Sequence, residues 1–297
     1  MMLRGAIYGL SAAAIWGGMY VVSDVVLPVI PPFALLTLRL LLGLVVLIPL
    51  WWRSQRGRDQ GFQLPKGRDA FRLLAVGLVG FGFSIGAQFV GTDLSTAMNG
   101  SLVTSASPAF ILIFALLILK ERLTRTQIVA VVLATIGVLI ILDPTQAQFG
   151  SETFVGDVSL AIAALTWGLY SVLVRLVSRQ FDTLLVTIYA FVGGLFLTVP
   201  AAFLERTGRS IGEIDLPVII GVLYLGVVST AGAMWLWNRS FALVDASIAS
   251  LFFFAQPVVG AVLSVVLLGQ QFTPALALGS ALIGTALLLS LSPRRVA

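Results

Sequence analysis

Long apolar stretches separated by short polar connections run along the whole chain. A helix needs roughly 20 mostly apolar residues to cross about 30 Å of hydrocarbon. Stretches of this kind lie at 5–26, 33–52, 72–91, 97–119, 126–143, 156–178, 183–204, 217–237, 246–268 and 273–292. The longest hydrophilic connection, between Arg53 and Arg72, is too short for a separate soluble domain. The pattern therefore predicts an all-α integral membrane protein with ten transmembrane helices.

Composition points to the same class of protein. Of the 297 residues, 59% are hydrophobic and 10% are charged, and the mean hydropathy is +1.04. A soluble domain carries about a quarter of its residues as charges. The chain has no Cys and no His, which excludes disulfides, imidazole bases and metal sites built on those ligands, so we expect no cofactor. The first stretch also resembles a signal peptide, but nine more follow it, so we interpret it as the first helix.

Basic residues are distributed unevenly between the two sides of the membrane. If the N-terminus lies in the cytoplasm, only Arg206 and Arg209 of the 18 Lys and Arg residues fall in outer loops, and only Arg39 lies well inside a span. Cytoplasmic loops of membrane proteins carry such an excess. We therefore expect both termini in the cytoplasm. The same rule accounts for the net charge of +5 without a nucleic-acid partner.

Several motifs occur twice in the same order. Trp16-Gly17 recurs as Trp167-Gly168, the run PAFILIFALLILKERLT from Pro108 is echoed by PVVGAVLSVVLLGQQFT from Pro257, and 134–142 is echoed by 281–289. Each copy holds five predicted spans, an odd number, so the second copy enters the membrane from the opposite side. The pattern predicts two inverted five-helix repeats, 1–143 and 144–297, which together form one transport domain around a site near the bilayer midplane. A duplication without functional meaning is the alternative.

Two of the six Trp residues lie deep in their predicted spans. Trp16 and Trp167 are each about 17 Å along a helix that rises 1.5 Å per residue, and Tyr20 and Tyr170 follow one turn later. Buried aromatic stripes often serve helix packing alone, but lipid offers no partner to their polar tips. Both a substrate site and packing fit these four residues. The other Trp residues lie near predicted helix ends and are interpreted as an interfacial belt. They are Trp51, Trp52, Trp235 and Trp237.

Amide side chains also lie within the predicted spans. Gln88, Asn99 and Gln256 each place an amide in the hydrocarbon region, where it needs a partner from another helix or from a wet cavity. We therefore take these three residues as candidate substrate-binding residues. Deep Ser and Thr side chains can bond to their own helix backbone, so we give them no role in a site.

Arg39 is the one cation expected well inside a span. It could snorkel to the outer surface, pair with Asp24 or Asp93 at neighbouring helix ends, or act near an outer gate. The other acidic residues lie at helix ends and in loops, and His is absent. The sequence therefore shows no deep proton relay.

The order and duplication of these motifs resemble the EamA type of the drug/metabolite transporter superfamily. The resemblance covers nearly the whole chain and rests on the Trp-Gly pair in the first helix of each half, on SASPAFILIFALLILKERLT ending at Thr124, and on ATIGVLIIL ending at Leu142. The second half departs from the pattern, since Gln270 and Gln271 stand where the first half has Glu121. The resemblance implies a multi-pass transporter of the bacterial inner (plasma) membrane.

Within this superfamily the chain is most similar to bacterial amino-acid exporters, particularly the YddG-type exporters of aromatic amino acids. Small multidrug exporters hold a cation with a carboxylate upstream of the first-helix Trp, where this chain has only Ser11–Ile15. Nucleotide-sugar carriers hold phosphates with Lys and Arg, and here only Arg39 is available. The resemblance therefore implies export of small hydrophobic or aromatic amino acids by alternating access, without an evident coupling ion.

Three other functions are alternatives to amino-acid export. A proton-coupled drug or metabolite exporter of the same superfamily is the closest alternative. An enzyme acting on lipid would need a nucleophile and a base, and without Cys or His the chain shows no recognisable constellation. A passive assembly protein would not explain polar residues at depth in both halves. We expect a lipid-embedded monomer with a small-molecule substrate and no enzymatic activity.

Overall fold

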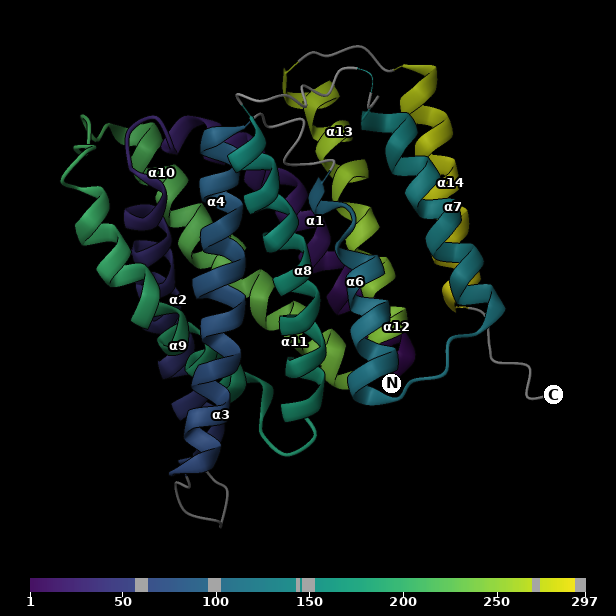
Figure 1. The fold of residues 1–297 in the computed structure, drawn as a ribbon, viewed down its shortest axis with the longest axis horizontal. Helices are drawn as coiled ribbons and strands as arrows, with labels where there is room; N and C mark the ends of the chain where they lie inside the picture. Colours follow the sequence, from purple (N-terminus) through teal and green to yellow (C-terminus); the bar gives the residue numbers. More distant parts are fainter. Residues whose placement is uncertain (57–63, 96–102, 143–144, 146–152, 269–272, 292–297) are drawn as a thin grey trace.

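The computed structural model describes residues 1–56, 64–95, 103–142, 145, 153–268 and 273–291 (Figure 1). Within these ranges every regular element is a helix. The elements up to residue 142 are α1 (Met2–Val26), α2 (Pro32–Gln55), α3 (Arg68–Gly77), α4 (Ile85–Leu94), α6 (Ser107–Phe114) and α7 (Arg125–Leu142). The later ones are α8 (Phe154–Val177), α9 (Thr183–Glu205), α10 (Leu216–Leu223), α11 (Ala233–Leu243), α12 (Ala246–Ala249), α13 (Ala255–Leu268) and α14 (Pro274–Leu291).

Several of these helices are joined end to end through segments of different winding. A π-helical segment, η1 (Leu78–Ser84), joins α3 to α4, and another, η4 (Tyr224–Gly232), joins α10 to α11. A further π-helical segment, η2 (Ala115–Leu119), continues α6, and the 3₁₀ segment η5 (Ser250–Phe254) joins α12 to α13. The chain therefore forms fewer and longer continuous helical rods than there are separately labelled elements.

Five helical rods are long and apolar enough to cross a membrane, counted over the described part of the chain. They are Pro32–Gln55, Arg68–Leu94, Phe154–Val177, Thr183–Glu205 and Leu216–Leu243. Shorter apolar helices span Ser107–Leu119, Arg125–Ile141, Ala246–Gly260 and Ala277–Leu289. The outer face of α2 exposes Leu41, Val45 and Ile48 by 45%, 69% and 46%. Because such apolar surface is unfavourable in water, these helices belong in lipid.

Most predicted spans agree with the helices to within a few residues. Two differ in a way that matters for the site. The stretch predicted at 217–237 continues as helix to Leu243, and the stretch predicted at 97–119 begins in residues outside the described part, with α6 starting at Ser107. The longer helix moves Trp237 inward by almost two turns.

Local sequence explains where many helices begin. Pro occupies the first turn of α2, α6 and α10, where its missing N–H costs no helical hydrogen bond. The carboxylates of Asp182 and Asp215 accept from the backbone N–H groups of Leu184 and Val218, both at 3.0 Å, and so cap α9 and α10.

Two glutamates cap helices that lie far away in sequence. Glu205 accepts from the N–H groups of Phe33 and Ala34 at the start of α2, at 2.9 and 3.1 Å. Glu121 accepts from Ala246 and Ser247 at the start of α12, at 3.0 and 3.1 Å. Glu205, the last residue of α9, thereby joins α9 to α2, and Glu121, which follows η2, joins its segment to α12.

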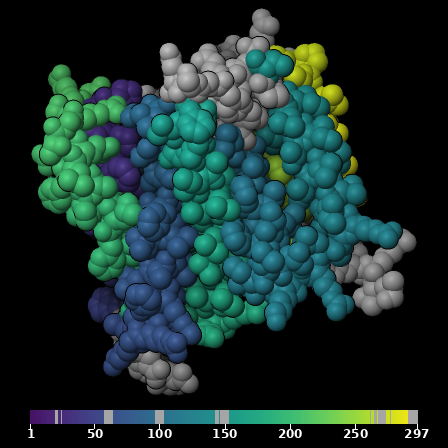
Figure 2. Space-filling model, viewed as in Figure 1, coloured from purple at the N-terminus to yellow at the C-terminus, as the bar shows by residue number. Residues whose placement is uncertain are grey.

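Helices from the two parts of the sequence alternate in space. α1 packs against α11 and α13, α2 and α3 against α9, α4 and α6 against α8, and α7 against α14. Figure 2 shows α9 and α10 in green beside α3 and α4 in blue, with α8 and α6 following on the same face. One large apolar cluster fills the space among α1, α2, α8, α9 and α11, and a smaller one joins α7 to α13 and α14.

Candidate functional site

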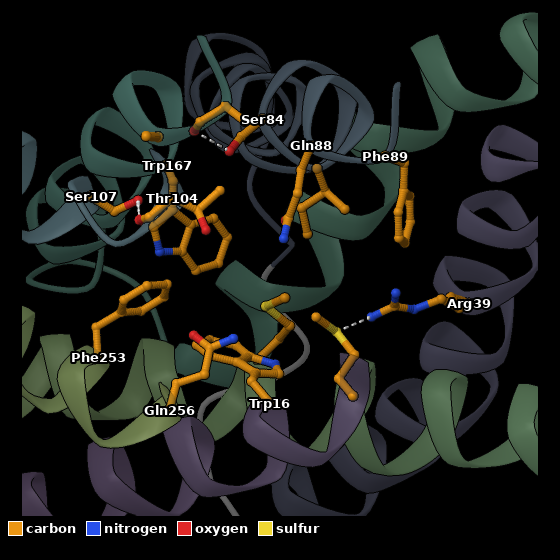
Figure 3. A pocket seen from close by; sticks show the side chains of 15 residues that line it. Trp16, Arg39, Ser84, Gln88, Phe89, Thr104, Ser107, Trp167, Phe253 and Gln256 are labelled. Carbon is orange, nitrogen blue, oxygen red and sulfur yellow. Dashed lines mark hydrogen bonds between the residues drawn. The ribbon is translucent and has the colours of Figure 1, made fainter. Parts of the chain in front are cut away.

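A cavity of about 530 Å³, including its mouth, lies among α1, α2, α4, α8 and α13. Figure 3 shows Trp16, Arg39 and Gln88 reaching into it from one half of the sequence, and Trp167, Phe253 and Gln256 from the other. The two halves of the chain therefore build one cavity together.

The repeated Trp-Gly pair has the same geometric role in both halves. A Cβ atom on Gly17 would lie 2.9 Å from the Gln256 carbonyl oxygen and from the Gly260 nitrogen, so the glycine lets α1 press against the backbone of α13. A Cβ atom on Gly168 would lie 2.7 Å from Phe110 Cβ and 3.0 Å from the Ile111 nitrogen, so α8 presses against α6 in the same way. The preceding Trp in each helix lines the cavity.

The two cavity tryptophans contact each other edge to face, with ring centroids 5.6 Å apart and an interplanar angle of 78°. Their N–H groups differ. Trp16 Nε1 donates to the Ser229 carbonyl oxygen at 3.1 Å, whereas Trp167 Nε1 is buried without a hydrogen-bond partner. Trp16 is therefore held in place by the fold, whereas the Trp167 ring lines the cavity with its N–H group unpaired.

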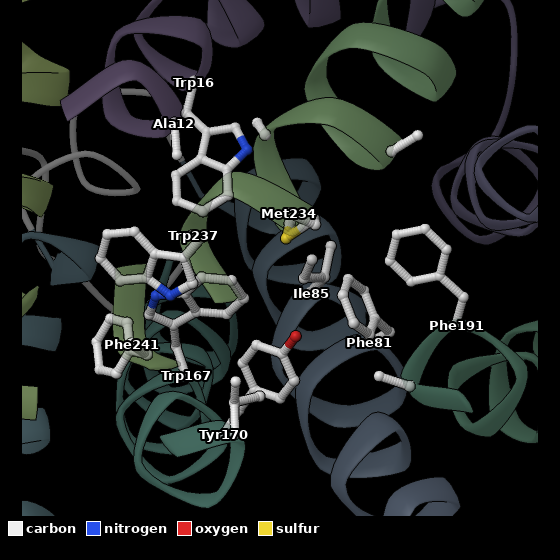
Figure 4. Packing of buried hydrophobic residues seen from close by; sticks show 14 of the residues in the cluster. Ala12, Trp16, Phe81, Ile85, Trp167, Tyr170, Phe191, Met234, Trp237 and Phe241 are labelled. Atoms are coloured by element: carbon white, nitrogen blue, oxygen red, sulfur yellow. The ribbon is translucent and has the colours of Figure 1, made fainter. Parts of the chain in front are cut away.

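Trp237 completes this aromatic cluster (Figure 4). Its ring lies 5.3 Å from that of Trp16 and 6.2 Å from that of Trp167, and the side chain is fully buried. The interpretation of Trp237 as an interfacial residue is therefore wrong, because the helix continues to Leu243. Trp51, only 8% exposed, is also buried, while Trp52 is half exposed.

Two π-helical segments hold neighbouring helices beside the cavity through polar groups. In η4, the Thr230 hydroxyl donates to the Leu225 carbonyl five residues earlier, at 2.7 Å, and the Ser229 carbonyl accepts from Trp16. In η1, Ser84 donates to the Ala163 carbonyl oxygen on α8 at 2.9 Å. Wider helical winding redirects backbone groups, which is one reason why π-helical turns recur at functional sites.

Arg39 is only 1% exposed and lines the cavity. Its Nε donates to the Thr230 hydroxyl at 2.9 Å, and its Nη2 lies 3.5 Å from Met19 Sδ. Two expectations are thereby corrected. Arg39 does not snorkel to the surface, and Asp93 pairs with Arg209 at 2.9 Å instead. The guanidinium lies buried beside Thr230 of η4 and Met19 of α1, whereas Asp93 lies at the end of α4 within reach of Arg209.

Of the candidate amides and tyrosines, the structure places some in the cavity and others outside it. Gln88 and Gln256 line the cavity. Tyr170 does not: its hydroxyl donates to Asn238 Oδ1 at 3.0 Å within the core, and Asn238 Nδ2 donates to the Thr187 hydroxyl at 3.0 Å. Asn99 and the side chains of Tyr20 and Asp24 lie outside the described part of the structure.

Several lining residues carry no signal in the sequence. Met19, Phe89, Met234 and Phe253 belong to ordinary apolar helix faces, and only the packing of the helices turns them toward the cavity. Ser107 and Thr104 also line it, and the Ser107 hydroxyl donates to the Thr104 carbonyl, as expected for serine in a helix. Among the described residues, no group of three His, Cys, Asp or Glu side chains could hold a metal ion.

Comparison with known proteins gives a consistent result. The model of the EamA-like transporter family matches twice, over residues 3–143 and 154–292. A protein of Bacillus subtilis strain 168 named "Uncharacterized transporter YetK" is 28% identical over 275 residues, covering 90% of this chain and 81% of its own. An "Uncharacterized transporter" of Archaeoglobus fulgidus is 24% identical over 259 residues, covering 86% of each chain.

A solved crystal structure shares the fold. It superposes with a TM-score of 0.81 at 21% sequence identity and covers 97% of this chain and 96% of its own. The fold and the two family matches account together for nearly the whole sequence. The chain therefore belongs to the EamA-like transporter family and is a membrane-embedded transporter.

Proposed function

We propose that the protein exports small hydrophobic or aromatic amino acids and related metabolites by alternating access around the cavity of Figure 3. The observation that carries this proposal is the lining of the cavity. Trp16, Trp167 and Phe253 supply rings from both halves of the chain, and no carboxylate is among the lining residues that the structure describes. Aromatic faces favour a flat or apolar solute body.

The proposed mechanism requires two equivalent gates. We infer that residues 1–143 and 144–297 form inverted five-helix repeats, making ten spans with both termini in the cytoplasm. Three observations support this inference: the family model matches each half separately, Gly17 and Gly168 make equivalent close contacts, and Glu121 and Glu205 tie the halves together. Both gates are then present in one chain, which suits a monomer in the plasma membrane.

Coupling to an ion is not part of the proposal. A proton-coupled exporter needs a titratable group that the solute and the proton share, and the described cavity lining has only Arg39 as a charged residue. Arginine stays protonated over the physiological range. We therefore expect the solute to move down its own gradient.

The test uses the purified protein in liposomes loaded with radiolabelled phenylalanine, tryptophan, alanine or a cationic dye, with protein-free liposomes as the control. Efflux is followed with and without a pH gradient. We expect phenylalanine and tryptophan to leave at rates that the pH gradient does not change. Movement of the dye alone, or transport that follows the proton gradient, would support the coupled drug exporter instead.

A further inference from the structure

Arg39 presents a buried positive charge to the cavity with few partners of its own. Its Nε bonds to one hydroxyl and its Nη2 lies near a sulfur, which is a weak acceptor. Its Nη1 has no hydrogen-bond partner. Among the side chains that the structure describes, the carboxylates that form ion pairs do so with Arg72, Arg175 and Arg209, and none with Arg39. A buried charge normally requires a counter-charge or a full set of hydrogen bonds.

The fold fixes the direction in which this charge points. Thr230 holds Nε from the π-helical segment η4, and its own hydroxyl proton is committed to Leu225. The guanidinium carbon lies over the Phe89 ring, 5.5 Å from its centre, within the range of a cation–π contact. In Figure 3 the free end of the guanidinium turns toward the cavity, on the side of Gln88. The planar guanidinium therefore keeps Nη1 as a donor for an anion.

The charge lies at one end of a cavity whose other lining residues are neutral and mostly apolar or aromatic. Figure 3 shows Arg39 on one side and the rings of Trp167 and Phe253 on the other, with the Gln88 side chain entering between them. A solute that fits must place an acidic group and an apolar body at opposite ends. Because the described lining has no carboxylate, it offers an ammonium group only ring faces and neutral oxygens.

We propose that Arg39 is the carboxylate-binding residue of the cavity, and that the protein selects solutes by one carboxylate and an apolar or aromatic body, whether or not they carry an amino group. The proposal rests on the proposed function and narrows its substrate class. Amino acids are then one subset of the substrates. Aromatic monocarboxylates bind as well, and aromatic amines without a carboxylate bind more weakly.

A ligand series on the unmodified protein tests this without any substitution. Binding of phenylalanine, 3-phenylpropionate and phenethylamine to the protein in lipid nanodiscs is measured by calorimetry at constant pH. A hydrogen bond to a charged group contributes about 1.5–3 kcal/mol, which corresponds to roughly tenfold to a hundredfold in affinity. We therefore expect 3-phenylpropionate to bind at least about tenfold more tightly than phenethylamine and within a few-fold of phenylalanine.

Substitutions of Arg39 test whether this residue causes the preference for a carboxylate. R39Q removes the charge but keeps a hydrogen-bond donor, and we expect it to abolish the preference for the carboxylate. R39K keeps the charge without the planar guanidinium and should retain part of it. The control is R72Q, an exposed residue on α3 whose change should leave the preference intact.

The outcomes separate this proposal from the proposed function. If phenethylamine binds as tightly as 3-phenylpropionate, or if R39Q retains the full preference, Arg39 is not the carboxylate site, although export of aromatic solutes still stands. If none of the three ligands binds, the aromatic substrate class fails and this proposal fails with it.

Discussion

At the residue scale, the two cavity tryptophans have the same place in the repeated motif but different environments. Trp16 uses its N–H group to hold a backbone carbonyl, while the N–H group of Trp167 has no partner. The sequence alone gives no reason to expect different partners for the two N–H groups. The difference arises because the π-helical segment η4 presents the Ser229 carbonyl to α1, and the structure gives Trp167 Nε1 no equivalent acceptor.

This difference leads to a prediction for the two Trp→Phe variants. Both substitutions remove a similar amount of ring surface, but W16F also leaves the Ser229 carbonyl without its donor, at a cost of about 1 kcal/mol. We expect W16F to melt about 2 °C below W167F in a thermal-shift assay of purified protein. W167F should fold like the unmodified protein and bind aromatic solutes more weakly.

The reverse order of melting temperatures would contradict this assignment. A loss of solute binding that follows the loss of stability in both variants would show that the two rings serve packing alone. Substitution of Tyr170 cannot separate solute binding from packing in this way, because its hydroxyl is bonded to Asn238 within the core.

At the element scale, close helix contacts depend on glycine where backbone meets backbone. α7 and α14 pack through Gly137 and Gly279: a Cβ atom on Gly279 would lie 2.6 Å from the Gly137 carbonyl oxygen. Gly284, on the same helix, has no atom within 4 Å of its would-be Cβ. In lipid, where apolar surface does not drive association, small residues allow the van der Waals contact that holds helices together.

We therefore predict opposite results for two alanine substitutions in α14. G279A forces the helices apart and should lower the free energy of unfolding by about 1–3 kcal/mol, as overpacking does elsewhere. G284A should be neutral or stabilising by up to about 1 kcal/mol, since alanine favours the helical state. Thermal unfolding of the purified variants measures both. Equal destabilisation by the two substitutions would contradict the packing seen between α7 and α14.

At the scale of the whole molecule, the proposed topology can be tested because the chain has no native Cys. Ser54 and Ser210 are both exposed, at the end of α2 and in the connection after α9. We predict that a membrane-impermeant maleimide labels S210C in intact cells and labels S54C only after the membrane is permeabilised. Labelling of both, or of S54C alone, in intact cells would overturn the orientation with cytoplasmic termini.

Sequence determined the class of the molecule and most of its helices. Apolar stretches of membrane length are recognisable without a structure, because each helix satisfies its own backbone hydrogen bonds and needs only an apolar exterior to enter lipid. The repeated Trp-Gly pair was equally readable, and the structure brings both tryptophans to one cavity. The family match extends over both halves of the chain, as the duplicated motifs indicated.

Only the tertiary structure decided which polar and aromatic groups share the cavity. Arg39 and Tyr170 are both buried in helices, yet one lines the cavity and the other bonds within the core. Trp237 joined the aromatic cluster because its helix runs further than the hydropathy pattern predicted. A linear pattern reports depth and burial but not the rotation of one helix against another, and that rotation determines whether a buried side chain faces a cavity or a neighbouring helix.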